Sequence, residues 1–380
     1  MSLTSQLHTG ALGAWCAERL PGAGALVAQV QTAAATTRPV RPLLRQVEPE
    51  HWAAVGGAFG QRLAFLIQHA PPYYALLGAA RAGLVDRAWP DRVATAFPTH
   101  AELPEPQHHR ACQLRPSPTG WLDLAEGHAQ PSDPALRHGE QVATDLITRL
   151  VAYQAAHAPP GTIAAAGAET GLARVCWVLA GWENAYRTGG QLPDALAALC
   201  DRHDGFTVDN LCGLADQAVV AELAALAAKV TTSGTLDRLH VLPDHPAPRN
   251  ALGYAGPVFI PHWADGDLLL GTGGATTLLD VKTVMHVRDG QRVARWLYQL
   301  LGYAWLDPAD RYHIRHVGLY LARHGILLTW PFDQFTGVLL GNTHPRTATT
   351  RRREFLSLAI HVMAAEGADP TWLGTESADR

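Results

Sequence analysis

The sequence predicts an α/β fold in which a large helical region precedes a mixed sheet that is itself flanked by helices. Up to about residue 256, apolar residues recur at helical spacing; after that, short apolar runs alternate with turn residues. The chain has 380 residues, 47% hydrophobic and 17% charged, so it can bury a substantial core and is not disordered as a whole. We therefore expect a sheet near the C-terminal end with helices on its faces.

The part before the sheet is predicted to be helical, with one interruption. Residues 1–100 form the first helical region, whose clearest helices span 52–69 and 73–84. Residues 101–135 are rich in proline and histidine and predict a loop or linker, because repeated prolines block helices and sheet ladders. Residues 136–256 form a second helical region that we expect to pack on the sheet. Its helices are predicted at 136–156, 162–187, 193–200 and 216–230, the last with Asp216 as its N-cap.

Residues 257–345 are predicted to hold the sheet, and residues 346–380 a C-terminal helix and tail. The expected elements are strands at 258–261, 267–270 and 276–284, a helix at 292–306, and a hairpin of strands 317–321 and 326–330. A helix between neighbouring strands predicts a parallel pair, and the hairpins predict antiparallel ones, so the sheet should be mixed.

Composition excludes several classes of protein. The formal net charge of −4 excludes a globally basic coat for nucleic acid, although a local basic face remains open. No apolar run reaches the length of about 18 residues that a membrane span needs, and no secretory signal precedes the first helix. The five cysteines include no Cys-x-x-Cys pair. We expect a cytoplasmic protein with free thiols and no membrane association.

The clearest chemical signal lies in the predicted strand 276–284. Arginine supplies nearly all the basic residues of this chain, so a lysine indicates a position where arginine cannot replace a compact amine. Lys282 is such a lysine, and it lies in an apolar run. Because strand side chains alternate, Asp280 and Lys282 share one face. Burial of these groups is costly unless they pair with each other or bind a metal. From the residues alone, a structural ion pair at a strand end is an open alternative.

Neighbouring segments place further polar groups near this strand. A turn through 271–274 would return the chain so that Asp267 lies beside Asp280. Two carboxylates and a backbone carbonyl form the hard oxygen site that Mg²⁺ or Mn²⁺ prefers. On the following helix, Gln299 and Tyr303 are four residues apart and share a face that can reach the sheet.

These residues resemble the motifs of the PD-(D/E)XK nuclease superfamily, in particular its RecB-like branch. The motifs are Gly266-Asp267, Asp280-x-Lys282 and Gln299-x-x-x-Tyr303, and the resemblance covers about residues 258–330. It implies a restriction-endonuclease-like core. It also implies a Mg²⁺- or Mn²⁺-dependent deoxyribonuclease whose partner is DNA.

The resemblance also implies roles for individual residues. Asp267, Asp280 and the Val281 carbonyl would bind the metal, and Lys282 would position the attacking water. Gln299 and Tyr303 would support the site or touch the substrate backbone.

The sequence departs from the family in one helix motif. RecB-like members carry a histidine or glutamate ahead of the sheet, and segment 56–60 resembles the glycine-rich start of that helix but is followed by no such histidine. Glu183 is the candidate for the missing metal ligand and catalytic acid, with a solvated helix face as the alternative. The iron–sulfur cluster of some relatives is not expected, because no cysteine follows Cys212.

The substrate-binding surface is predicted from arginines near the site, with ordinary surface charge as the equal alternative. The candidates are Arg288, Arg292, Arg295 and Arg351. Trp296 and Trp305 can stack on bases, but their apolar spacing favours the core.

Three functions follow from these patterns. The first is a nuclease acting on DNA, in phage defence, mobile-element biology or repair. The alternative is a catalytically inactive or partner-activated protein of the same fold, which binds nucleic acid or binds another protein through the N-terminal helices. The third is an unrelated soluble protein in which Asp280 and Lys282 form only a structural pair.

Overall fold

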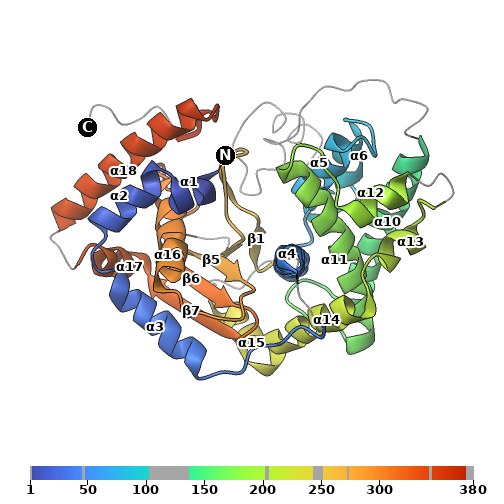
Figure 1. Ribbon diagram of the computed structural model, residues 1–380, viewed down its shortest axis with the longest axis horizontal. Helices are drawn as coiled ribbons and strands as arrows, with labels where there is room; N and C mark the ends of the chain where they lie inside the picture. The colour runs from blue at the N-terminus through green and yellow to red at the C-terminus, as the bar shows by residue number, and fades with distance from the viewer. Residues whose placement is uncertain are drawn as a thin grey trace.

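The computed structural model describes residues 2–44, 48–101, 137–201, 205–242, 251–271, 274–341 and 345–373. In these residues the chain forms a five-stranded mixed sheet flanked by helices, as the sequence predicts (Figure 1). The strands, in their order across the sheet, are β1 Gly253–Ala255, β4 Leu268–Leu270, β5 Thr276–Lys282, β6 Ile314–Leu321 and β7 Ile326–Pro331. Only β5 and β6 pair in parallel, and the other neighbours are antiparallel. A separate pair contains β2 Val258–Ile260 and β3 Ala264–Asp265.

The two faces of the sheet belong to two hydrophobic layers. Leu268, Leu270 and Leu279 pack with one layer, whereas Leu269 and Leu278 pack with the other. This division follows from the alternation of side chains along each strand. The alternation predicted for β5 is therefore confirmed.

The first layer lies on the right in Figure 1 and consists of helices from the middle of the chain. Its helices are α4 Pro49–Ile67, α5 Tyr73–Arg81, α6 Trp89–Ala94, α10 Arg137–His157, α11 Ala166–Arg187, α12 Asp194–Cys200, α13 Val208–Gly213, α14 Gln217–Thr232 and α15 Thr235–Val241. The short α7 Pro98–Ala101 follows α6. As predicted, Asp216 caps α14, because its carboxylate accepts a hydrogen bond from the Val219 backbone N–H.

The second layer lies on the left in Figure 1 and combines both ends of the described chain. It contains α1 Leu3–Thr9, α2 Ala11–Arg19, α3 Ala23–Ala35, α16 Gly290–Trp305, α17 Phe332–Leu339, α18 Pro345–Ala365 and the 3₁₀ turn η2 Pro370–Leu373. Asp289 caps α16 through the backbone N–H groups of Gln291 and Arg292. Trp296 and Trp305 are buried here, as their spacing favours.

Two details differ from the predicted organisation. The first hundred residues are divided between the layers, since α1–α3 pack with α16 and α17 while α4–α6 lie opposite. Helical periodicity identifies a buried face but not the side of the sheet that covers it. In addition, β1 begins at Gly253, ahead of the predicted boundary at 257. The predicted loop at 101–135 lies outside the described residues apart from Ala101, which ends α7.

No single helix among the described segments has both the length and the apolar character needed to cross a bilayer. The bent pair of α14 and α15 passes that test only when its two helices are taken together.

Candidate active site

The β4–β5 hairpin brings two carboxylates together. Leu268 pairs with Leu279, so Asp267 and Asp280, one residue further out on each strand, lie opposite each other. The backbone N–H of Val281 donates to Asp267 Oδ2 at 2.6 Å. The turn at 271–274 was expected to bring Asp267 beside Asp280, and the register confirms it.

The surroundings of the two carboxylates raise the pKa of each. Asp267 is accessible to solvent from a cavity but is closely surrounded by protein. Desolvation, followed by the charge of Asp280, raises the pKa of Asp267 to about 7. Asp280 is only 2% exposed, and burial raises the pKa of its carboxyl while the ammonium of Lys282 opposes that shift.

Lys282 connects the carboxylates to α16. Its Nζ lies 2.9 Å from Asp280 Oδ1 and donates to Gln299 Oε1 at 3.1 Å. Gln299 Nε2 in turn donates to the Tyr303 hydroxyl at 2.7 Å and to Thr4 Oγ1 at 3.1 Å. The i, i+4 spacing on α16 thus places both residues on the face that meets Lys282. The structure joins four of the predicted residues in one hydrogen-bonded chain from strand to helix.

Glu183 comes from the opposite layer to the same place. Together with Asp265, Asp267 and Val281, it lines a cavity of about 310 Å³ between β4, β5, α4 and α11. Gln61 Nε2 donates to Glu183 Oε2 at 2.7 Å. Within the described residues, no group of three or more His, Cys, Asp or Glu side chains is arranged to hold a metal ion.

Arg187 connects the acidic groups of this cavity. Its Nη2 lies 2.6 Å from Glu183 Oε1 and 3.0 Å from Asp265 Oδ2. Both carboxylates therefore have a cationic partner. The sequence predicts no role for Arg187, and its ion pair with Asp265 joins residues too far apart in sequence for spacing to reveal it.

The donor set fits a hard divalent cation in part. Asp267 has a carboxylate open to the cavity, and Asp280 Oδ2 has no aligned hydrogen bond although Lys282 Nζ lies 2.7 Å away. The Val281 carbonyl belongs to a residue that also lines the cavity. Two carboxylates and one carbonyl agree with oxygen coordination of Mg²⁺ or Mn²⁺.

Glycines of α4 form the wall opposite the strands. Gly56, Gly57 and Gly60 line the cavity, and a Cβ added at Gly56 would lie 2.8 Å from Thr283 Oγ1. A larger residue at Gly56 would therefore force the Thr283 side chain to move. Segment 56–60 was noted in the sequence for its resemblance to the family helix, but its contact with Thr283 was not foreseen.

The predicted substrate-binding arginines separate into three locations. Arg292 and Arg295 act on the same residue as Lys282: burial and then the charges of Arg295, Lys282 and Arg292 lower the pKa of His8. Arg292 also packs over the Trp296 ring, 5.7 Å from its centroid. Arg288 lines a different cavity. Arg351 pairs with Glu354 on α18 at 2.7 Å and is not joined to this group.

The chain matches no protein-family model, no curated protein and no solved structure. Its function must therefore be argued from the arrangement of these residues.

Proposed function

We propose that this protein is a Mg²⁺- or Mn²⁺-dependent nuclease that hydrolyses phosphodiester bonds of DNA. The observation that carries the proposal is the convergence of Asp267, Asp280 and Lys282 at one end of the β4–β5 hairpin. A structural ion pair needs only Asp280 and Lys282. Such a pair does not explain why a second carboxylate, Asp267, lies beside it. The raised pKa of Asp267 shows that its ionised form is unfavourable there.

The order of elements supports a restriction-endonuclease-like core. An acidic strand start, an Asp-x-Lys strand, a helix with Gln-x-x-x-Tyr and a parallel strand follow one another as β4, β5, α16 and β6. Both helical layers then cover this unit, which fits the family architecture implied by the motifs.

Asp267, Asp280 and the Val281 carbonyl are the groups that would hold the divalent cation. Bound there, such an ion supplies positive charge to the phosphodiester oxygens and lowers the pKa of a water molecule. The Lys282 ammonium stands beside the same carboxylates and can orient the attacking water by a hydrogen bond. Gln299 and Tyr303 position Lys282, since the amide oxygen of Gln299 accepts from Nζ and its nitrogen donates to the Tyr303 hydroxyl.

Glu183 is the third carboxylate of the cavity in this proposal. Gln61 and Arg187 hold it, so it reaches a cation only when Arg187 turns to another anion. A substrate phosphate is such an anion, and guanidinium groups bind phosphate with two parallel hydrogen bonds. Substrate entry would then free Glu183 at the moment it is needed.

The test is cleavage of linear, circular and single-stranded DNA with Mg²⁺ or Mn²⁺. We expect Lys282→Ala to lower the rate by about 100-fold or more, since it removes a charged group beside the reacting atoms. The matched control is Lys229→Ala, which removes a lysine from α14 outside this site. Equal rates in Lys282→Ala and Lys229→Ala, or cleavage that persists in EDTA, would contradict the proposal.

One observation favours the second candidate, a non-cleaving protein of the same fold. Glu183 and Asp280 are both paired with cations, and the described residues contain no group of three metal-ligating side chains. Binding of DNA by folded wild-type protein without cutting by either metal would support that candidate.

A further inference from the structure

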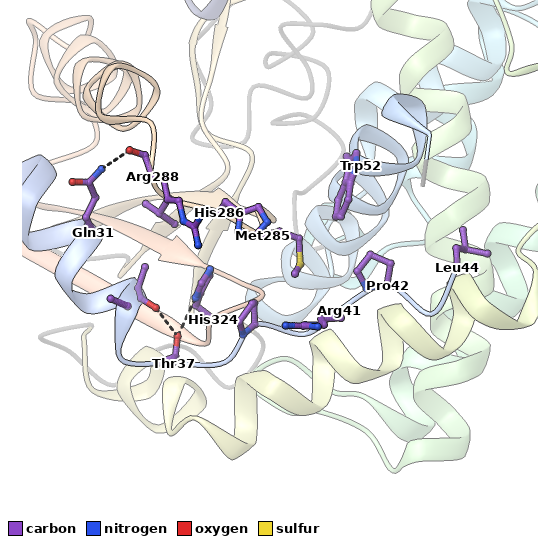
Figure 2. Close-up of a pocket in the computed structure, with 14 residues that line it drawn as sticks. Gln31, Thr37, Arg41, Pro42, Leu44, Trp52, Met285, His286, Arg288 and His324 are labelled. Atoms are coloured by element: carbon purple, nitrogen blue, oxygen red, sulfur yellow. Dashed lines mark hydrogen bonds between the residues drawn. The ribbon is translucent and has the colours of Figure 1, made fainter. Parts of the chain in front are cut away.

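A second and larger cavity lies next to the candidate active site. Its volume is about 1030 Å³, and it is bounded by α3, the segment 37–44, the start of α4 and the connection from β5 to α16 (Figure 2). Two of these elements line both cavities: Thr283 borders the smaller one and Met285 the larger, while α4 contributes Gly56 to one and Trp52 to the other. Trp52, Gly56 and Gly60 are spaced by four residues and so form one row along α4.

The lining of this cavity is cationic. Its charged side chains are those of Arg41 and Arg288, and it contains no aspartate or glutamate, in a chain whose net charge is −4. Among the described residues, neither Arg41 nor Arg288 has an ion pair, and both side chains are exposed. Concentrated positive charge without carboxylate partners indicates an anionic ligand.

An aromatic ring adds a second kind of contact. Trp52 is partly exposed and faces Met285 across the cavity in Figure 2. The guanidinium of Arg323 packs over one face of the ring, 4.9 Å from the centroid, so a stacked ligand must use the other face. A planar ring and guanidinium groups that line one cavity are the combination by which proteins hold a nucleotide.

A buried histidine also belongs to the lining of this cavity. His324 is 5% exposed and lines the cavity, and its Nδ1 bonds to Thr37 Oγ1 at 3.0 Å. Nε2 has no aligned hydrogen bond, although the carbonyls of Met285 and Ala34 partly offset the lowering of the pKa of His324 by burial. Contacts with Thr37 and with these backbone carbonyls therefore hold the His324 ring in the wall of the cavity.

We infer that this cavity binds a nucleotide of single-stranded DNA, with the base stacked on Trp52 and the phosphate held by Arg41 and Arg288. The inference rests on the proposed function and names its substrate: a strand held here would pass Gly56 and Thr283 to reach Asp267. A free nucleotide offers the same chemistry, and the experiment distinguishes the two sources.

The experiment measures fluorescence anisotropy of labelled oligo(dT) of about 16 nucleotides, the upper size of a single stacking groove, with EDTA present to prevent cleavage. We expect Trp52→Ala to weaken binding by roughly 5- to 150-fold, the range of base–aromatic stacking. The double variant Arg41→Ala/Arg288→Ala should weaken binding by about 10-fold or more and reduce its salt dependence.

The matched control removes the same total charge elsewhere. Arg149→Ala/Arg315→Ala deletes two exposed arginines that line neither cavity, and it should bind nearly as tightly as wild type. If both double variants lose the same binding affinity, the loss is due to net charge alone and the inference is overturned. If Trp52→Ala fails to fold, the Arg41→Ala/Arg288→Ala variant still tests the inference, because the side chains of Arg41 and Arg288 are exposed and their removal should not disturb the fold.

Competition identifies the source of the nucleotide. Affinity that rises with oligonucleotide length assigns the cavity to a DNA strand, and displacement by thymidine monophosphate at equal concentration assigns it to a free nucleotide. No binding of either probe overturns the inference. If the wild type cleaves DNA and the Arg41/Arg288 variant binds it as tightly, the proposed nuclease function stands and this binding site is wrong. If the variant binds DNA more weakly but no protein cleaves it, the binding site stands and the nuclease function is wrong.

Discussion

The residue that best separates a reactive site from a structural ion pair is Asp267. Its carboxylate faces Asp280 across the hairpin, and desolvation plus that neighbouring charge raise its pKa to about 7. A protein with only a structural requirement at this position would avoid the repulsion with an asparagine or serine. A cation bound between the two carboxylates removes the repulsion, which is why strained acid pairs are frequent at metal sites.

The raised pKa of Asp267 predicts how stability depends on pH. The folded protein keeps a proton that the unfolded chain releases between about pH 4 and 7, so this group lowers stability as pH rises through that window. In metal-free protein, the free energy of unfolding of Asp267→Asn should therefore rise relative to that of the wild type between pH 5 and pH 8. We expect about 1 kcal/mol, well below the full shift, because water in the cavity screens the carboxylate.

Urea unfolding at the two pH values in EDTA measures this difference. The control is Asp333→Asn on α17, an exposed carboxylate distant from Asp280 in sequence, for which no such gain is expected. A wild-type protein that becomes more stable than Asp267→Asn as pH rises would show that the sign, and hence the assigned cause, is wrong.

At the scale of elements, α4 is shaped by its approach to the end of β5. Two of its glycines differ in what a methyl group would meet: at Gly56 it would lie 2.8 Å from Thr283 Oγ1, whereas at Gly60 nothing lies within 4 Å. Alanine in a helix is favoured over glycine by about 0.5–1 kcal/mol. Gly60→Ala should therefore stabilise the protein by that amount, and Gly56→Ala should lose the gain or become destabilising.

Thermal unfolding of the two variants provides the comparison within one helix. The pair controls for propensity, since both substitutions change glycine to alanine in the interior of α4. Equal stabilisation of both would mean that α4 and β5 do not approach as closely as the Gly56–Thr283 contact requires.

The elements that the sequence predicts are those specified by local patterns. Alternation along 276–284, the turn before it and the apolar stripe of 292–306 each depend on residues close in sequence, and β5 and α16 form where expected. Asp267, Asp280 and Lys282 come together for the same reason. The partners of this unit are not local. Gln299 contacts Thr4 near the start of the chain, and Glu183 meets Gln61 in a helix layer that periodicity alone cannot orient.

For the whole molecule, Arg323 is the point at which distant parts of the chain meet. It is fully buried at the end of β6, where it pairs with Glu222 of α14 and donates to the backbone carbonyls of Thr283 and Val40. Val40 belongs to the segment that crosses from α3 in one layer to α4 in the other, and its N–H donates to the Arg323 carbonyl. One side chain thus fixes α14 and the segment between the layers to the end of the strand that carries Lys282.

Removal of that side chain should be far more costly than removal of an exposed arginine from the same strand region. Arg323→Ala removes the guanidinium from buried Glu222 and leaves His51 as its remaining partner, and the loss of one member of a buried ion pair typically costs about 3–5 kcal/mol. Arg315→Ala breaks an ion pair with Asp310 in which both side chains are about half exposed, and should cost less than about 1 kcal/mol. Denaturant unfolding compares the two variants, and a fluorescent label on each layer reports whether they still unfold together. Because Arg323 fixes the segment that connects the layers, we expect the Arg323→Ala transitions to separate while those of Arg315→Ala coincide. Similar small losses in both variants, with coincident transitions, would show that apolar packing on the sheet holds the layers together without this buried arginine.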